Sequence, residues 1–149
     1  MPEYLETTVD KFIFRVAADR VYSGEGLWVL AEGGNVRIGL SDYLQQRSGD
    51  VAFAEVKPVG ATLSAGDEVA TIETIKVNVV LPSPVTGKVV EVNPSMATAP
   101  ETVNQDPYGQ GWLAVIEAEA WDRDQAGLLS PQAYLEVMRR EAEEEVKKL

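Results

Sequence analysis

Short runs of apolar and β-branched residues, separated by glycine- and proline-containing turns, recur from residue 12 to residue 117. Most runs have the length of an ordinary strand, and several alternate apolar with polar positions, as a strand with one buried face does. Glu32-Gly33-Gly34-Asn35 is a strong turn signal between two such runs. The pattern predicts strands over residues 12–17, 27–31, 35–40, 51–56, 69–73, 77–81, 88–93 and 112–117.

The C-terminal segment has a different period, typical of an amphipathic helix from about residue 130 to residue 149. Ser130 is a favourable N-cap, and Pro131 suits the first helical position, where no backbone donor is needed. The apolar residues that fall on one face of this helix are Tyr134, Leu135, Met138, Ala142 and Val146. The acidic residues expected on its solvent-facing side are Glu136, Glu141 and Glu143 to Glu145.

Shorter helical segments are predicted between the strands. Ser41 can cap a short helix that Gly49 would end. Residues 93–106 are rich in Pro, Ser, Thr and Asn and have room for one or two helical turns, whereas residues 106–111 form a tight turn cluster. We therefore predict a mainly β protein that forms a single domain over residues 1–149, with a helical tail.

The chain contains neither cysteine nor histidine. Their absence excludes thiol nucleophiles, disulfides, zinc or iron–sulfur sites built on thiolates, and the usual general base near neutral pH. The acidic residues are scattered, and no pair has a spacing that supports acid–base catalysis. A chain so poor in reactive side chains is expected to borrow its chemistry from a bound group rather than to act as an enzyme or a metal-binding protein.

The chain is strongly acidic, with a formal net charge of -11 and a pI of about 4.4. Binding to nucleic acid or to anionic lipid requires a concentrated positive patch, so neither is expected as a partner. The first residues have no basic start and no apolar run, unlike a secretion signal, and no segment approaches the length of a membrane span. We therefore expect a cytoplasmic protein.

Lys76 lies between the predicted strands 69–73 and 77–81, at the tip of a hairpin. Gly66 and Gly87 permit sharp bends on either side of this hairpin. A hairpin tip can hold an amine away from the body of the domain, where the amine serves as an attachment handle for a cofactor. A lone lysine at such a tip is otherwise an ordinary solvated side chain.

The run around Lys76 resembles the biotinyl and lipoyl attachment domains in the order and spacing of its residues. The matching positions are Gly60, Leu63, Gly66, Asp67, Val69, Ile72, Glu73, Thr74, Lys76, Pro84, Gly87, Val89 and Val92. Glu73-Thr74-Ile75-Lys76 is similar to the lipoyl form, Glu-Thr-x-Lys, whereas biotin carriers have methionine on both sides of the lysine. The resemblance implies lipoate as the cofactor, attached covalently to Lys76, and leaves a biotinyl carrier as the minor alternative.

Beyond the hairpin, the chain resembles the H-protein of the glycine cleavage system over roughly residues 10–138. The similar segments are residues 39–43, 49–53, 76–93 and 103–113. The resemblance implies a barrel-sandwich hybrid fold with short flanking helices and a C-terminal helix. It also implies that a lipoate ligase or lipoyl transferase loads Lys76, and Glu73 either positions the lysine for that enzyme or is simply an exposed carboxylate.

Two segments depart from the H-protein pattern. In place of the family's His-Glu-Trp in the first strand, this chain has Asp10-Lys11-Phe12-Ile13-Phe14. After the lysine, where the family has small residues, it has Val77-Asn78-Val79. Both segments are expected to lie where the arm or its partner enzymes make contact, so the departures bear on which partners this chain serves.

Two shuttle functions fit this resemblance. The preferred hypothesis is a lipoate-binding protein of bacterial sulfur oxidation, whose arm carries sulfur-containing intermediates with a heterodisulfide-reductase-like complex. The alternative is the glycine cleavage H-protein, whose arm carries an aminomethyl group between glycine decarboxylase and the aminomethyltransferase and is reoxidised by dihydrolipoamide dehydrogenase. A biotinyl carrier and an unmodified binding module are the remaining alternatives.

Overall fold

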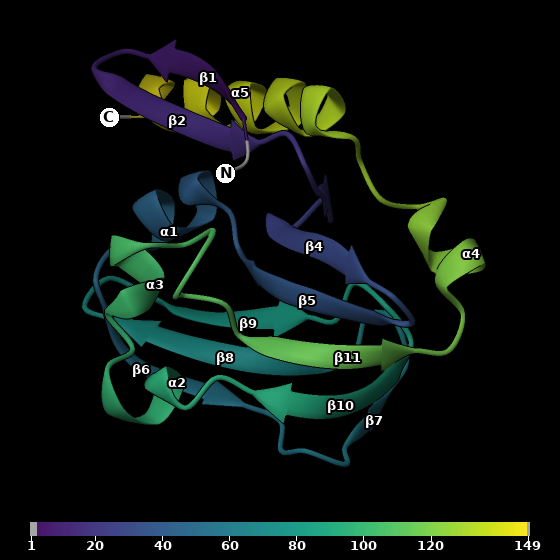
Figure 1. Cartoon of the computed structure of the whole chain (residues 1–149). Helices are drawn as coiled ribbons and strands as arrows, with labels where there is room; N and C mark the ends of the chain where they lie inside the picture. The colour runs from purple at the N-terminus through teal and green to yellow at the C-terminus, as the bar shows by residue number, and fades with distance from the viewer. Residues whose placement is uncertain (1–2, 149) are drawn as a thin grey trace.

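Antiparallel β-sheets make up most of the molecule (Figure 1). The computed structural model describes residues 3–148. The largest sheet has the strand order β3-β4-β5-β11-β10-β7 and consists of β3 (Val21–Tyr22), β4 (Leu27–Glu32), β5 (Asn35–Leu40), β11 (Ala114–Ala118), β10 (Gly87–Val92) and β7 (Thr62–Leu63). A second sheet has the order β6-β8-β9 and consists of β6 (Val51–Val56), β8 (Glu68–Thr74) and β9 (Asn78–Pro82).

The main core is formed by apolar side chains that come from both of these sheets. Ile38 and Ile116 of the larger sheet and Ile72 and Leu81 of the smaller one are almost completely buried. Burial of each such side chain stabilises the fold by about 1.5–3 kcal/mol. The mainly β barrel-sandwich hybrid predicted from the sequence is confirmed, and the hairpin of β8 and β9 is one wall of its core.

Helices lie at the edges and ends of the sheets: α1 (Asp42–Ser48), α2 (Ser95–Thr98), α3 (Thr102–Gln105), α4 (Trp121–Gln125) and α5 (Pro131–Lys147). The Ser41 hydroxyl caps α1 by accepting a hydrogen bond from the amide of Leu44. Gly49 ends α1 with a φ of 92°, a conformation that favours a residue without a Cβ. The Ser130 hydroxyl caps α5 in the same way by accepting from the amide of Ala133, as the sequence predicts.

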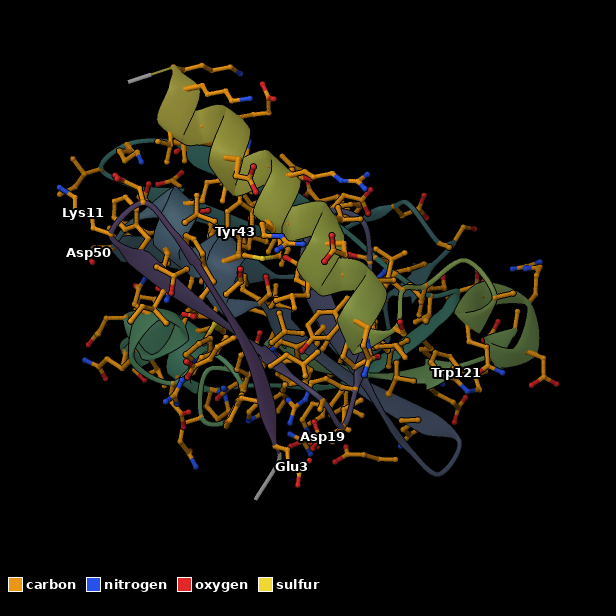
Figure 2. The ribbon with its side chains drawn as sticks, turned by 90° about the horizontal axis from the view of Figure 1, so that it is seen from above. Glu3, Lys11, Asp19, Tyr43, Asp50 and Trp121 are labelled. Atoms are coloured by element: carbon orange, nitrogen blue, oxygen red, sulfur yellow. The ribbon has the colours of Figure 1, made fainter. Side chains whose placement is uncertain are left out.

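A separate two-stranded hairpin, β1 (Tyr4–Val9) and β2 (Phe12–Ala17), lies beside α5 at the top of the molecule (Figures 1 and 2). A second apolar cluster is formed by the β1–β2 hairpin, α1 and α5 together with β3 and β4. It includes Val9, Phe14, Val16, Tyr22, Trp28, Tyr43, Tyr134, Met138 and Ala142. The apolar face predicted for the C-terminal helix is therefore confirmed, because it packs against this hairpin and buries Tyr134, Met138 and Ala142.

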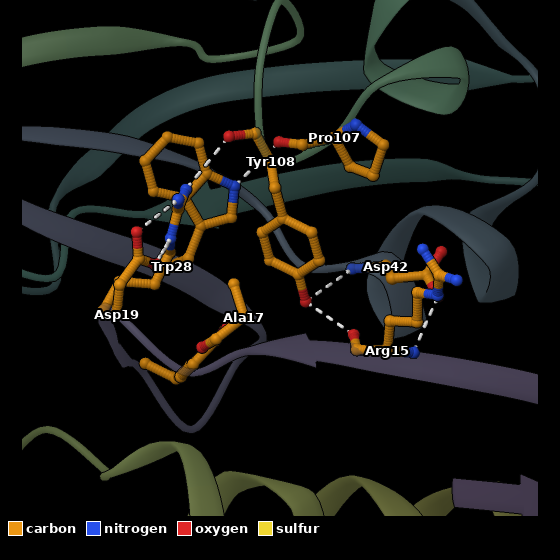
Figure 3. Close-up of polar contacts among 9 residues, drawn as sticks. Arg15, Ala17, Asp19, Trp28, Asp42, Pro107 and Tyr108 are labelled. Carbon is orange, nitrogen blue, oxygen red and sulfur yellow. Dashed lines mark hydrogen bonds and ion pairs between the residues drawn. The ribbon is translucent and has the colours of Figure 1, made fainter. Parts of the chain in front are cut away.

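The turn that contains Tyr108 ties the hairpin to the rest of the chain (Figure 3). The Tyr108 hydroxyl donates to the carbonyl of Arg15 in β2 at 2.7 Å and accepts from the amide of Asp42 in α1 at 3.2 Å. The indole of Trp28 donates to the carbonyl of Pro107 at 2.8 Å. This turn therefore holds three separate parts of the chain together.

Several elements were not predicted from the sequence. Strands β3 and β7 have two residues each, which is too short to produce a recognisable period. Strand β1 and helix α4 were also missed, and the predicted strand 112–117 begins later, at Ala114. Trp112 and Leu113 continue the apolar run but lie between the turn that ends at Gly111 and the strand.

The two glycines that flank the lysine hairpin serve different purposes. Gly66 has a φ of +97°, as expected for a sharp bend. Gly87 does not have a positive φ of this kind. A glycine is required there because a Cβ would collide with the carbonyl oxygen of Glu117 on the neighbouring strand β11. The sequence-based explanation of Gly87 as a conformational bend is therefore wrong.

Candidate functional site

Lys76 lies in the three-residue turn between β8 and β9, where the sequence places it. The hydroxyl of Thr74 organises this turn by accepting from the amides of Lys76 at 3.2 Å and Val77 at 3.0 Å. The amide of Thr74 also donates to the carbonyl of Val77 at 2.8 Å. These bonds occupy the amides of Lys76 and Val77 and fix the direction in which the lysine side chain leaves the turn.

The amine of Lys76 does not extend freely into solvent. Its Nζ donates to the carbonyl of Arg47 at 3.1 Å, and its Cδ lies 3.7 Å from the place where a Cβ on Gly49 would stand. Arg47 belongs to the last turn of α1, whose carbonyls lack intrahelical donors and carry partial negative charge that favours an ammonium group. The expectation that the tip holds the unmodified amine away from the domain is therefore wrong: the side chain is exposed but lies back against α1.

Glu73 lies on β8 opposite Asn78 of β9, with its side chain exposed. Within residues 3–148 its carboxylate makes no hydrogen bond or ion pair. The structure therefore does not bring Glu73 into contact with Lys76. The carboxylate is available to another protein, which is compatible with either of the two roles that the sequence leaves open.

Two cavities meet at Lys76. The first, which we call the hairpin pocket, has a volume of about 240 Å³ and is lined mainly by apolar side chains: Val9, Phe12, Phe14, Tyr43, Ala142 and Val146. The second, the β9 pocket, has a volume of about 580 Å³ and follows residues 76–82. Lys76 and Arg47 line both cavities, so the amine stands at the boundary between them.

Arg47 links α1 to the acidic side of α5. Its guanidinium lies 3.6 Å from the Glu141 carboxylate and 3.4 Å from that of Glu145. Burial raises the pKa of Glu141 above its usual range, against a smaller lowering by the Arg47 charge. Because both side chains of each pair are about half exposed, these ion pairs contribute modestly to stability. The sequence predicted that Glu141 and Glu145 are simply solvated, and these ion pairs show that they are not.

Tyr43 is the functional candidate that the sequence analysis missed. Its side chain comes from α1 and lies between the hairpin and α5 (Figure 2), where it is only 3% exposed and lines the hairpin pocket. Its hydroxyl is buried and has no hydrogen-bond partner among residues 3–148. Burial raises the pKa of Tyr43 to about 12, against a smaller lowering by the nearby Arg47 charge. Buried polar atoms nearly always have partners, so a buried hydroxyl without one is unusual.

Exposed apolar side chains surround the lysine on the outer side. Ile75, next to Lys76, is 93% exposed, and Phe53 on β6 is 70% exposed. Val77 and Val80 are exposed as well. Apolar groups left in water around one amine are typical of a surface that another protein contacts.

The described residues offer little chemistry besides this amine. Within residues 3–148 there is no group of acidic residues arranged to hold a metal ion, and no helix there is long and apolar enough to cross a membrane. An accessible primary amine can form an amide with a carboxylic acid. The arrangement is therefore suited to carrying a covalently attached acyl group beside an apolar cavity.

Comparison with known proteins gives consistent matches. The family model described as "Glycine cleavage H-protein" matches residues 20–141. The chain is 43% identical to the glycine cleavage system H protein of Mycolicibacterium smegmatis over 126 residues, which cover 83% of this chain and 96% of that protein. It is 39% identical to the corresponding protein of Thermus thermophilus over 128 residues, covering 85% and 98%. The crystal structure of the H protein from Mycobacterium marinum superposes with a TM-score of 0.74 at 32% identity, covering 81% of this chain and 97% of that one.

The family match includes one part of the site and leaves another part outside. Asp10 to Phe14 precede residue 20, so they lie outside the matched region, and the family match gives no support for comparing them with the family's first strand. The hairpin of β1 and β2 and the last turns of α5 lie outside the matched region, whereas the β8–β9 hairpin with Lys76 lies inside it. The resemblance estimated from the sequence, residues 10–138, therefore begins too early.

Proposed function

Because the chain belongs to the glycine cleavage H-protein family, we propose that Lys76 carries its lipoyl arm and that the loaded protein shuttles a bound intermediate between partner enzymes. Lipoate attached covalently to a lysine is the cofactor of this family, whose members are carriers rather than catalysts. The observation that carries the proposal is the position of Lys76, the exposed lysine at the tip of the β8–β9 hairpin within Glu73-Thr74-Ile75-Lys76.

The residues around Lys76 fit such a group. An amide formed on Nζ keeps one N–H, so the hydrogen bond to the carbonyl of Arg47 can persist after acylation. The side chain also borders an apolar cavity of about 240 Å³ that suits a hydrocarbon arm. The dithiolane ring of lipoate supplies reversible disulfide–dithiol chemistry when bound. The chain supplies the attachment point, the direction in which the arm leaves the turn, and a surface for partners.

The comparisons favour glycine cleavage over sulfur oxidation as the setting. The relatives described above carry the name glycine cleavage system H protein. One of the two arguments for sulfur oxidation, a changed first strand at Asp10 to Phe14, falls outside the family match. The other argument, Val77-Asn78-Val79 after the lysine, concerns the partner-facing side of the hairpin and has no support from the comparisons. We therefore propose that the arm carries an aminomethyl group between glycine decarboxylase and the aminomethyltransferase, with reoxidation by dihydrolipoamide dehydrogenase.

Loading of Lys76 is tested by intact-mass analysis after co-expression with a lipoate ligase. We expect one lipoyl increment on the wild-type chain and none on Lys76→Arg, which keeps the charge but cannot form the amide. The fold should be unchanged, because substitution of an exposed side chain costs about 0.5 kcal/mol or less. An equal increment on the variant, or a biotin increment on the wild type, contradicts the proposal. An unmodified wild-type chain in the same cells would instead favour the binding-module alternative.

The choice of partners is tested by mixing the lipoylated protein with glycine decarboxylase and glycine. Release of CO₂ that depends on the lipoylated chain, with Lys76→Arg from the same co-expression as the unloaded control, supports the glycine cleavage function. No release, together with reduction of the arm by a heterodisulfide-reductase-like complex, would support sulfur oxidation. The role of Glu73 stays a prediction, and Glu73→Gln in the ligase assay tests it, since unchanged loading would mean that Glu73 is an ordinary surface residue.

A further inference from the structure

The β1–β2 hairpin has two outer edges, and the rest of the chain covers only one of them. Along β2, the amide of Arg15 donates to the Asp42 carboxylate at 2.9 Å, and its carbonyl accepts from the Tyr108 hydroxyl at 2.7 Å. The carbonyl of Ile13 accepts from the Gln46 side chain at 3.0 Å. The polar backbone groups along the edge of β2 are therefore satisfied by side chains.

The edge of β1 has no such cover. Glu6 lies opposite Arg15, and because the amide and carbonyl of Arg15 point away from β1, those of Glu6 point away from β2. The same alternation applies to Tyr4 and Thr8, and all three residues are exposed. Their backbone groups have no hydrogen-bond partner among residues 3–148. In Figure 1, β1 is the outer strand of the hairpin, at the top of the molecule.

The β1 edge also differs from the edges of the two larger sheets. The outer strands of the large sheet, β3 and β7, have two residues each. Those of the small sheet, β6 and β9, pair with β8 in an interrupted register. In contrast, β1 has six residues, contains no proline and pairs with β2 without interruption. Short strands, bulges and prolines protect an edge from further pairing, so an edge without them is suited to an added strand.

The charges along this edge favour a basic partner. Residues 3–10 carry three acidic side chains, Glu3, Glu6 and Asp10, and no basic one. Glu6 forms an ion pair with Arg15 at 3.2 Å but is still about half exposed. A second copy of this chain would bring the same acidic residues and a net charge of -11 to the edge, and like charges opposite each other destabilise a sheet. A lysine or arginine opposite Glu6 would instead form a favourable cross-strand pair.

The turn end of the edge lies beside Lys76. Val9, the last residue of β1, and Phe12, the first residue of β2, line the hairpin pocket together with Lys76. A segment that pairs with β1 therefore has one end close to the residue proposed to be loaded. The hairpin precedes residue 20, so this edge lies outside the region that the family model matches.

We propose that the free edge of β1 binds an extended, basic segment of a partner protein, which adds a third strand to the hairpin. The backbone groups of Tyr4, Glu6 and Thr8 supply the hydrogen bonds, and the Glu6 carboxylate pairs with a lysine or arginine of the segment. The interface goes beyond the function proposed above, because it forms whether or not Lys76 carries a lipoyl group. A partner bound in this way is held next to Lys76.

The probes are three short peptides, added to the full ¹⁵N-labelled chain and followed by NMR. Acetyl-(Lys-Val)₃-amide can pair as a strand, acetyl-(Lys-Pro)₃-amide has the same charge but lacks the proline amides, and acetyl-(Glu-Val)₃-amide has the opposite charge. We expect the amides of Tyr4, Glu6 and Thr8 to exchange rapidly with solvent in the free chain. Saturating acetyl-(Lys-Val)₃-amide should slow their exchange about tenfold, and the other two peptides should not.

Equal effects of the two lysine peptides would reduce the interaction to charge, and equal effects of the two valine peptides would remove the preference for a basic segment. Either result overturns the inference. Slow exchange of the three amides in the free monomer also overturns it, because the edge would then already be covered.

Thr8→Pro tests the backbone contribution. It removes one outward-pointing amide and leaves the ladder with β2 intact, because the bonds to β2 come from the alternate residues Leu5, Thr7 and Val9. Binding of acetyl-(Lys-Val)₃-amide should weaken about tenfold through the lost bond and the proline ring, while the amides of Leu5 and Thr7 keep their protection. Unchanged binding in a variant with an intact hairpin would overturn the inference.

Glu6→Gln tests the charge contribution. It should weaken binding of the same peptide about twofold, as expected for an exposed ion pair. Its matched control is Glu32→Gln, which removes the same charge from a similar ion pair, with Arg37 at 3.1 Å, on β4 and β5 of the large sheet. No change is expected for the control. Equal weakening by the two variants would assign the effect to the net charge of the chain and overturn the proposed pairing at Glu6.

The remaining outcomes separate this interface from a dimer and from the carrier function. Protection of the Tyr4, Glu6 and Thr8 amides that rises with chain concentration, without any peptide, would show that a second copy occupies the edge and would overturn the inference. Absence of a lipoyl adduct on Lys76 removes the proposed function and leaves this interface standing. A normal adduct on a chain that binds none of the peptides removes the interface alone.

Discussion

The β8–β9 hairpin that presents Lys76 and the β1–β2 hairpin beside α5 are built in different ways. The first is the wall of the main core, with Ile72 and Leu81 fully buried behind the lysine turn. The second belongs to no larger sheet and rests on a separate apolar cluster, with Tyr108 bridging Arg15 and Asp42 as a polar connection. The first lies inside the family match and the second outside it.

Because of this difference, the position of Lys76 depends on the main core, whereas part of its surroundings depends on the β1–β2 hairpin. A lysine carried by the main core keeps its place as long as the fold exists. The β1–β2 hairpin can open without unfolding the rest of the chain, because its strands pair only with each other and not with the two larger sheets. The attachment point and the β1–β2 hairpin should therefore fail under different perturbations.

Truncation of one buried side chain in each region gives the largest expected effects. Ile72→Ala should lower the free energy of unfolding by about 2–5 kcal/mol, because it leaves a cavity in the main core. Phe14→Ala should cost about 3–5 kcal/mol locally and open the hairpin, while amides of β8 and β9 keep their protection. Urea denaturation and amide hydrogen exchange measure both effects. Equal loss of protection in β8 for the two variants would show that the regions form one cooperative unit.

A smaller effect is expected from Tyr108→Phe, which removes the hydroxyl that joins β2 to α1. The carbonyl of Arg15 and the amide of Asp42 lose a partner, at a cost of about 1–3 kcal/mol. Hydrogen exchange should accelerate in β1 and β2 and stay unchanged in β8 and β9. Tyr4→Phe is the control, since that ring is 40% exposed and its loss of a hydroxyl should change neither region. Faster exchange around Lys76 in Tyr108→Phe would contradict the separation of the two regions.

The smallest effect concerns the alkaline limit of stability. Burial raises the pKa of Tyr43 from its ordinary value of 10.0 to about 12. The folded state therefore holds this proton more tightly than the unfolded state, so the contribution of Tyr43 is fully present below pH 10 and is lost as pH rises toward 12. Tyr43→Phe should make the fall of unfolding free energy over this range shallower, as measured by denaturant titration at several pH values. An identical slope in wild type and variant would show that Tyr43 is not buried in solution.

The strands and the lysine turn were predictable because their causes are local. Residues 35–40 and 51–56 carry a period and turn signals at both ends, and both match β5 and β6 without correction. The caps at Ser41 and Ser130 were predictable for the same reason, since a cap is set by a few neighbouring residues.

The surroundings of Lys76 could not be predicted, because they arise from contacts between distant residues. The amine donates to the carbonyl of Arg47, which is far away in the sequence. No pattern near either residue predicts that hydrogen bond. Tyr43 has an ordinary place on a short helix, and its unpaired hydroxyl becomes apparent only once β2 and α5 have packed against it. The role of Gly87 likewise depends on the approach of a neighbouring strand.

The hydrogen bond between the Lys76 ammonium and the end of α1 has a consequence for how the carrier is handled. A ligase has to take this amine from the helix carbonyl and remove its proton before acylating it. Acylation then deletes one positive charge, so the formal net charge moves from -11 to -12. Empty and loaded carriers should therefore separate on an anion-exchange column, and the proportion of each in a growing cell becomes a quantity that can be read from a chromatogram.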